Sequence, residues 1–249
     1  MRDEMTAQTM KHDMEEILGS GCRELGLTLT ETMKEQFDAY YDILVRTNEV
    51  MNLTAITEYR EVLQKHFLDS LCIAKVVQME NISNFIDIGT GAGFPGLPIK
   101  ILFPEVTAVL ADSLQKRVGF LKEAAEVCGL KGVTALHGRA EDLARDAELR
   151  ESFDLAVSRA VAQLPVLAEY ALPFVRTGGC FTAYKSTNID NEVEASSHAL
   201  SVLGGEIGRK EVYCIPGTDI PRMLIRIEKT GRTPDKYPRK AGLPSKKPL

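Results

Sequence analysis

The sequence predicts an α/β fold in which a mixed seven-stranded sheet, with helices on both faces, follows an N-terminal helical cap. Two observations carry this prediction: short β-rich runs alternate with helix-length segments from Phe85 onward, and the residues before about Met79 show helical periodicity with almost no strand signal. We therefore divide the chain into a helical cap (1–82), an α/β domain (83–230) and a basic C-terminal tail (231–249).

Composition limits the classes of protein that the chain can belong to. With 249 residues, 44% of them apolar and 26% charged, it can bury a sizeable core. No apolar run approaches the roughly 18 residues of a membrane span, so we expect no membrane segment. Five cysteines are scattered without a CxxC pair, and the histidines lack metal-ligand spacing. We therefore expect no disulfide framework, no metal site and a reducing, cytoplasmic location.

Within the cap, two series of apolar residues recur at three- and four-residue steps, which predicts three or four helices. The series are Phe37, Tyr40, Tyr41, Leu44 and Val45, and Val62, Leu63, His66, Phe67, Ser70 and Leu71. His66 and Asp69 lie one turn apart on the second series. A structural role is the more common one for such a pair, and a ligand or catalytic role stays open.

Seven strands are expected. They are Phe85–Ile88, Val106–Ala111, Val133–His137, Leu155–Ser158, Cys180–Tyr184, Val212–Ile215 and Met223–Ile227. Helical stretches separate the first five, which implies right-handed crossovers and parallel strands. The last two lie close together around Pro216, Gly217 and Pro221, so a hairpin should close the sheet.

The strongest motif lies where the first strand turns into the first helix of the domain, Asp87-Ile-Gly89-Thr-Gly91-Ala-Gly93-Phe-Pro-Gly96. Glycines let the backbone turn tightly and approach a ligand, and free amides at the following helix can meet it. The motif contains GxGxxG, so nicotinamide binding is an alternative. An acid in front of the glycines disfavours a pyrophosphate and suits the ammonium of an amino-acid-like ligand.

Two further turns complete a predicted ligand site. Asp112 ends the second strand, 19 positions after Gly93, the spacing at which an acid accepts hydrogen bonds from ribose hydroxyls. Asp112 could equally cap the helix that follows. The turn at 138–141 follows the third strand, where an adenine would lie, and helix capping is its alternative role.

Taken together, these features resemble S-adenosylmethionine-dependent methyltransferases, and more narrowly the RsmG (GidB) family, which methylates N7 of a guanine in 16S ribosomal RNA. The resembling stretches are Met51-Asn-Leu-Thr-Ala, Lys65-His-Phe-Leu-Asp-Ser-Leu71, Asp87–Pro98, Ala111-Asp-Ser-Leu-Gln-Lys-Arg117, Arg139-Ala-Glu141, Ser158-Arg-Ala-Val161 and Lys236-Tyr-Pro-Arg-Lys-Ala-Gly242. The resemblance implies a Rossmann-like class I fold and a cofactor pocket. The implied cofactor-binding residues are Asp87, Gly89, Gly91, Gly93, Phe94, Asp112, Ala140, Glu141 and Arg159.

The segment after the fourth strand lacks the devices of other nucleic-acid methylases. It has neither the Asn/Asp-Pro-Pro-aromatic box of amine methylases nor a nucleophilic cysteine for pyrimidine C5. Guanine N7 needs neither, because its lone pair carries no proton, so no general base is expected. Arg159 is the candidate for positioning the cofactor carboxylate or guanine O6, with a surface ion pair as its alternative.

The charge is uneven along the chain. Residues 229–249 carry seven Lys/Arg and one acid, a charge of +6, which leaves −11 on the rest. A basic tail on an acidic body favours a polyanionic partner, here small-subunit ribosomal RNA or a pre-ribosomal particle. The candidate RNA-binding residues are Lys185, Lys236, Tyr237, Arg239 and Lys240. We expect the tail to be irregular and to contribute little to cofactor binding, and a solvated tail is the alternative.

Two other functions stay open from the sequence. One is a non-catalytic RNA-binding ribosome assembly factor that only resembles a methyltransferase. The other is an NAD-dependent oxidoreductase, which Asp87 and the lack of an evident hydride-handling acid disfavour.

Overall fold

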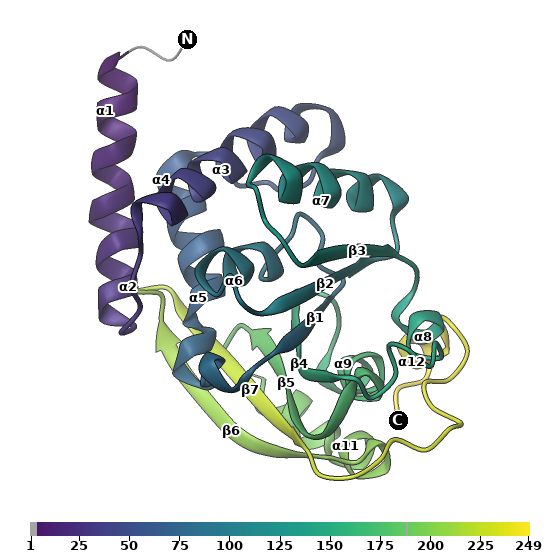
Figure 1. The fold of residues 1–249 in the computed structure, drawn as a ribbon. Coiled ribbons are helices and arrows are strands. Elements are labelled where there is room, and N and C mark those ends of the chain that lie inside the picture. Colours follow the sequence, from purple (N-terminus) through teal and green to yellow (C-terminus); the bar gives the residue numbers. More distant parts are fainter. Residues whose placement is uncertain (1–3, 188) are drawn as a thin grey trace.

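In the computed structural model, which describes residues 4–187 and 189–249, one sheet of seven strands runs in the order β3-β2-β1-β4-β5-β7-β6 (Figure 1). The strands are β1 (Asn84–Ile88), β2 (Thr107–Asp112), β3 (Val133–His137), β4 (Phe153–Arg159), β5 (Val175–Lys185), β6 (Gly205–Cys214) and β7 (Pro221–Lys229). The first five pair in parallel, and β7 pairs antiparallel with both β5 and β6. The predicted mixed sheet is therefore confirmed.

Strand β1 shows why the central strands are apolar throughout. Phe85 belongs to the hydrophobic cluster on one face of the sheet, and Ile86 and Ile88 belong to the cluster on the other. Because helices cover both faces of the sheet, side chains that point to either face are buried, and the strand shows no alternation of apolar and polar residues. The edge strand β6 begins at Gly205, seven residues before the predicted start. The prediction missed its first part because the exposed positions there carry charged residues, which give no apolar strand pattern.

One face of the sheet carries the N-terminal helices together with α6 and α7. These elements are α1 (Glu4–Asp13), α2 (Ser20–Glu24), α3 (Glu31–Met51), α4 (Tyr59–Val62), α5 (Asp69–Leu71), α6 (Gly96–Leu102), α7 (Gln115–Val127), the π-helical turns η1 (Met14–Gly19) and η2 (Leu63–Leu68), and the 3-10 turns η3 (Cys72–Lys75) and η4 (Met79–Asn81). Among the described residues, no helix is both long and apolar enough to cross a membrane.

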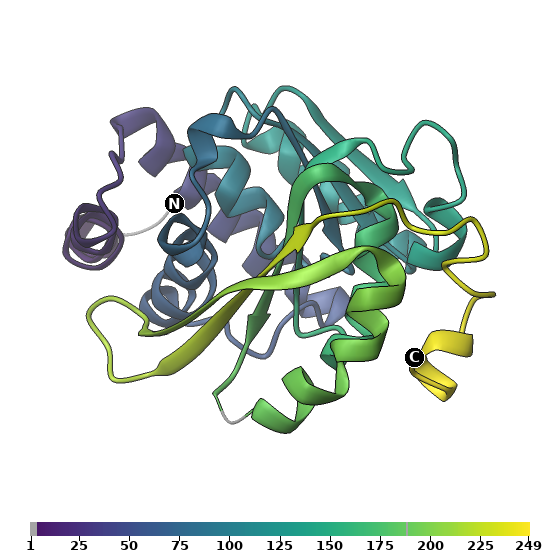
Figure 2. The ribbon, with the colours of Figure 1, turned by 90° about the horizontal axis from the view of Figure 1, so that it is seen from below.

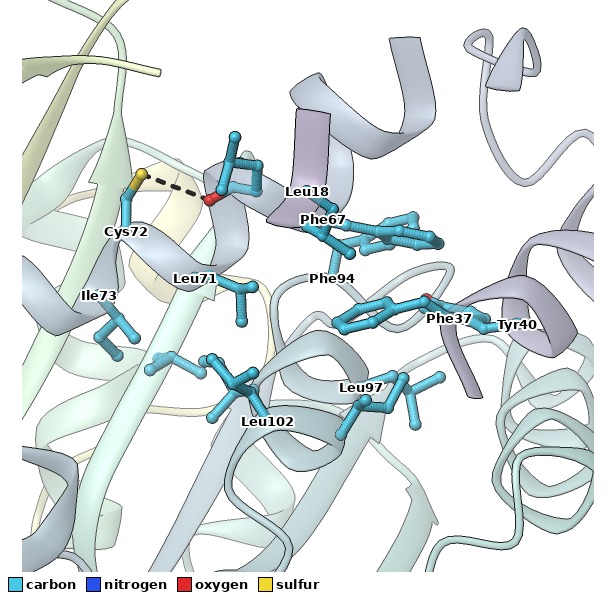
Figure 3. Packing of buried hydrophobic residues seen from close by; sticks show 14 of the residues in the cluster. Leu18, Phe37, Tyr40, Phe67, Leu71, Cys72, Ile73, Phe94, Leu97 and Leu102 are labelled. Atoms are coloured by element: carbon cyan, nitrogen blue, oxygen red, sulfur yellow. Dashed lines mark hydrogen bonds between the residues drawn. The ribbon is translucent and has the colours of Figure 1, made fainter. Parts of the chain in front are cut away.

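The N-terminal helices share their core with the sheet. Phe37, Tyr40, Phe67 and Phe94 meet in one cluster (Figure 3), in which the Tyr40 ring lies 5.3 Å from that of Phe67 and 5.4 Å from that of Phe94. Tyr40 also donates a hydrogen bond of 2.5 Å to the carbonyl of Ala92 in the glycine loop. The helical cap therefore packs directly on the loop that the sequence assigns to the cofactor.

The opposite face carries the remaining helices and the C-terminal segment (Figure 2). These helices are α8 (Ala140–Leu143), α9 (Leu164–Ala171), α10 (Asp190–Ala195), α11 (Ser197–Leu203), α12 (Leu243–Lys246) and the 3-10 turn η5 (Leu172–Phe174). The C-terminal segment has little regular structure, as expected, but it is docked on the domain. Its Tyr237 is only 8% exposed and belongs to the hydrophobic cluster of this face.

Candidate active site

The glycine loop joins β1 to α6 and is held from beneath by Asp87. Gly89, Gly91 and Gly93 adopt φ angles of +68°, +61° and +97°, which side chains disfavour. Asp87 Oδ2 accepts hydrogen bonds from the Thr90 hydroxyl at 2.6 Å and the Gly96 amide at 2.8 Å. The carboxylate therefore fixes both ends of the loop.

Asp87 is fully buried, with an exposed fraction of 0%. Burial raises the pKa of its carboxyl to about 7, although the hydrogen bonds from Thr90 and Gly96 act to lower it. Its second oxygen, Oδ1, is buried without a hydrogen-bond partner among the described residues. A cationic ligand group that reached Oδ1 would supply the missing donor.

We expect Asp87→Asn to change how stability depends on pH. Because the folded pKa lies above the ordinary value of about 3.9, the contribution of this carboxyl is fully present below pH 4 and is lost as pH rises through about 7. The neutral amide removes that loss, so the variant should gain stability relative to the parent by up to about 4 kcal/mol across this window. Urea denaturation of both proteins from pH 4 to pH 8 measures the difference, and a difference independent of pH would contradict the expectation.

Asp112 links the end of β2 to the glycine loop. Its Oδ2 accepts a hydrogen bond of 2.9 Å from the Gly91 amide, and its Oδ1 accepts one of 2.9 Å from the Leu114 amide. The second bond closes the turn before α7, where Leu114 holds the N-cap position. The carboxylate thus organises the start of this helix and also faces the cavity described next.

A cavity of about 240 Å³ opens between the ends of β1, β2 and β3. Its lining residues are Ile88, Gly89, Ala111, Asp112, Ser113, Gly138, Arg139, Ala140, Glu141, Val161, Ala162, Tyr170, Phe174 and Ser245. Four predicted cofactor-binding residues thus come together, namely Gly89, Asp112, Ala140 and Glu141. The structure places Asp87, Gly91, Gly93, Phe94 and Arg159 outside this lining. Val161, Tyr170 and Ser245 also line the cavity but are not among the predicted site residues. Val161 belongs to one of the resembling stretches, in which it had no assigned role, and Tyr170 and Ser245 lie in segments with no motif.

Arg159, at the end of β4, is the centre of a polar cluster. It donates to Asp69 Oδ2 at 2.9 Å, approaches His66 Nδ1 at 3.3 Å, and lies over the Phe94 ring with 5.1 Å between the guanidinium carbon and the ring centroid. Tyr213, on β6, donates to the other Asp69 oxygen at 2.9 Å. Arg159 does form an ion pair, but its pair with Asp69 is largely buried and does not lie at the surface, as the alternative predicted.

The environment of His66 defines its role. Burial and the neighbouring positive charge of Arg159 lower its pKa to about 3, so the imidazole is neutral. With Nδ1 facing Arg159, Nε2 is left to donate to the Thr54 hydroxyl, 2.8 Å away. His66 and Asp69, whose roles the sequence left open, are therefore both in contact with Arg159.

A second cavity, of about 580 Å³, adjoins this cluster. It is lined by Ile56, Lys65, His66, Asp69, Arg159, Ala160, Tyr184, Lys185, Ser186, Ile189, Glu192 and Arg222. The loop after β4 contributes Arg159 and Ala160 to this cavity and Val161 and Ala162 to the smaller one. Ala160 adopts a φ of +58°, which turns the chain between the two cavities.

The five candidate RNA-binding residues differ in what they contact. Lys236 and Lys240 are exposed, with the Lys236 ammonium 5.2 Å from the Tyr237 ring centroid. Arg239 is paired with the buried carboxylate of Glu169, and Tyr237 is buried. Lys185 donates to the Ala162 carbonyl at 2.7 Å and pairs with Glu192. Only the two exposed lysines present an unobstructed charge to a partner.

Comparison with solved structures supports the fold. The chain is similar to a ribosomal protein L11 methylase from Lactobacillus delbrueckii subsp. bulgaricus, with a TM-score of 0.50 and 16% identity over 71% of this chain and 81% of that one. The structure of StiE O-MT gives a TM-score of 0.54 with 13% identity over 76% of this chain and 83% of that one. At such identities the likeness concerns the fold alone, which is the Rossmann-like class I methyltransferase fold.

Sequence comparison identifies the family. Residues 33–213 match GidB, described as rRNA small subunit methyltransferase G. The ribosomal RNA small subunit methyltransferase G of Lachnoclostridium phytofermentans is 50% identical over 229 residues, which cover 92% of this chain and 95% of that protein. Its counterpart in Alkaliphilus metalliredigens is 48% identical over 233 residues, covering 94% and 98%. The chain therefore belongs to the GidB family of rRNA small subunit methyltransferases.

Proposed function

We propose that this chain transfers a methyl group from S-adenosylmethionine to N7 of a guanine in 16S ribosomal RNA. The observation that carries the proposal is the pair of adjoining cavities on the two sides of the loop 159–162. One is bounded by the glycine loop and a buried carboxylate, and the other is lined by several cations. Two substrates could therefore meet at this loop.

The smaller cavity fits the adenosine part of the cofactor. Asp112 is 3% exposed and presents its carboxylate to the cavity, where ribose hydroxyls can donate to it. Ala140 and Glu141 lie at the far side, suited to the adenine ring. Asp87 Oδ1, which lacks a donor among the described residues, would accept from the cofactor ammonium. Bound there, the cofactor supplies an electrophilic methyl group on its sulfonium.

The larger cavity suits the guanine. Arg159 carries five N–H donors, and a donor directed at guanine O6 would fix the base with N7 presented in its plane. His66 has both ring nitrogens engaged and a low pKa, so it is not suited to act as a general base. N7 carries no proton, and the reaction needs alignment of the two reacting groups rather than proton transfer.

Mass mapping of modified nucleosides tests the proposed reaction. In 16S ribosomal RNA from a strain lacking this protein, one 7-methylguanosine should be absent, and the purified enzyme should restore it to small subunits or to free RNA. An unchanged modification pattern would favour a non-catalytic assembly role. The substrate, together with five free cysteines, also supports our proposal of a cytoplasmic location.

Asp112→Ala should weaken cofactor binding by about 1–3 kcal/mol, because charge-assisted hydrogen bonds to ribose are replaced by water. Loss of the bond to the Gly91 amide adds to this effect by loosening the loop. Calorimetric titration with S-adenosylhomocysteine measures the change, with NADH as a second titrant. Unaltered affinity would leave Asp112 only its role at the start of α7, and tight NADH binding alone would favour an oxidoreductase.

Neutralising the exposed lysines of the C-terminal segment should weaken RNA binding without affecting the cofactor. The variant changes Lys236, Lys240, Lys246 and Lys247 to alanine. The control changes exposed lysines elsewhere, Lys11, Lys116, Lys122 and Lys131. Each lost phosphate contact should reduce the slope of log affinity against log salt by about 0.7–0.9. Filter binding at several salt concentrations measures it, and equal slopes for both variants would remove the segment from the RNA-binding surface.

A further inference from the structure

The C-terminal strap, which we define as residues 230–249, passes beside the smaller cavity. In Figure 1 it is the yellow segment that runs past α8 and ends near α12. Ser245, in α12, is one of the residues that line this cavity, with Glu141 and Tyr170. One wall of the predicted adenosine site is therefore built from the last residues of the chain.

A buried ion pair anchors the strap to α9. The Glu169 carboxylate, whose side chain is 1% exposed, accepts hydrogen bonds from the Arg239 amide at 2.7 Å and from its Nε at 2.9 Å, both at Oε1. Its Oε2 accepts from Arg239 Nη2 at 2.6 Å. A bidentate pair shielded from water is specific in its geometry, so it fixes the strap in one position.

Two arginines of the domain hold the main chain of the strap. Arg150 donates to the carbonyls of Thr233 and Tyr237, each at 2.9 Å. Arg145 donates to the carbonyl of Pro238 at 2.6 Å. These bonds satisfy strap carbonyls that no helix or strand pairs, which explains how a segment without hydrophobic periodicity can dock.

The strap also contacts a carboxylate that faces the cavity. The Gly242 amide donates a hydrogen bond of 2.8 Å to Glu141 Oε1. Glu141 is itself 3% exposed and lines the cavity. The position of the strap therefore determines how Glu141 is oriented toward a ligand.

We propose that the C-terminal strap is part of the cofactor site, with Ser245 and the Glu141–Gly242 contact completing the wall around the adenine. This inference rests on the proposed function and replaces the expectation that the tail contributes little to cofactor binding. Binding and docking are then coupled. If docking of the strap increases the affinity for the ligand, ligand binding must stabilise the docked strap by the same free energy.

Calorimetry with S-adenosylhomocysteine on the full chain tests the proposal. Arg239→Met breaks the anchoring pair and should weaken binding at least tenfold. Lys240→Met is the matched control, because it removes a neighbouring exposed cation whose side chain makes no contact with the domain among the described residues. The affinity of this variant for S-adenosylhomocysteine should equal that of the parent. Equal affinity in folded Arg239→Met and the parent would overturn the proposal.

Two further measurements guard against misfolding of Arg239→Met, which leaves the buried Glu169 without its cation. Ser245→Trp keeps the strap contacts of Arg239, Arg150 and Arg145 and places a large side chain in the cavity wall, so it should also weaken binding at least tenfold. Hydrogen exchange in the parent should slow at the strap amides, that of Gly242 included, when S-adenosylhomocysteine is added. Normal binding by Ser245→Trp together with unchanged exchange would refute the inference. If the parent itself fails to bind the ligand, the proposed function fails instead.

Discussion

Gly89→Asp should abolish cofactor binding while leaving the fold largely intact. A Cβ at this position would lie 2.6 Å from Val161 Cγ2, and the glycine itself has a φ of +68°. Because Gly89 lines the smaller cavity, the new side chain would fill that cavity and add a carboxylate beside Asp112. We expect S-adenosylhomocysteine affinity to fall at least 100-fold, about 2.7 kcal/mol, in calorimetry.

Gly26→Asp is the matched control for this substitution. Gly26 has a φ of +72°, nothing lies within 4 Å of where a Cβ would stand, and it lines neither cavity. Aspartate tolerates this backbone region better than most residues, so Gly26→Asp should lose about 1 kcal/mol of stability. Gly89→Asp should lose more, because its Cβ also meets Val161. The control should bind normally. Normal binding by folded Gly89→Asp would mean that the cofactor site lies elsewhere.

The sheet and the glycine loop could be predicted because their signals are local. All seven strands were found, since β-rich runs and the turns that bound them are contiguous in the chain. The loop from Asp87 to Gly96 was found because a strand, closely spaced glycines and a helix follow one another. Its internal contacts are local too, as the bond from Gly96 to Asp87 spans only nine residues.

The polar cluster around Arg159 could not be predicted, because its members lie far apart in sequence. Arg159 and Asp69 are 90 residues apart, and Tyr213 lies 144 residues beyond Asp69. A single His or Asp beside an apolar helix face gives no sign of its partner. Only the folded chain brings α5, the end of β4 and β6 together, and with them these three side chains.

In the C-terminal strap, the sequence could predict the total charge but not which charged side chains are free to bind a partner. Its positive charge was read correctly as a property of the sequence, but the charges do not all serve one purpose. Arg239 is paired with Glu169, and Lys229, which directly precedes the strap at the end of β7, is buried against Glu151. Counting charges cannot separate such paired cations from exposed ones like Lys240, because the acids that pair with them are distant in sequence.

Arg159→Met should reduce methyl transfer at least 100-fold, about 2.7 kcal/mol in activation free energy, with little change in cofactor affinity. Arg159 lines the larger cavity and not the smaller one, so we expect it to position the guanine rather than the cofactor carboxylate. Single-turnover methylation with saturating S-adenosylmethionine measures the first quantity, and calorimetry with S-adenosylhomocysteine measures the second.

Stability has to be separated from function in this test, because the substitution removes the cation that is hydrogen-bonded to the buried Asp69 and leaves it only Arg222, at 3.9 Å. Breaking such a pair costs about 3–5 kcal/mol, so the assay temperature must lie below unfolding of the variant. Arg176→Met is the control: it breaks the 2.6 Å pair with Asp154 at the opposite end of the sheet, away from both cavities. It should lose stability and keep its activity. If Arg159→Met instead binds S-adenosylhomocysteine at least tenfold more weakly, then Arg159 holds the cofactor carboxylate, and the donor to guanine O6 must be sought among the other cations of the larger cavity.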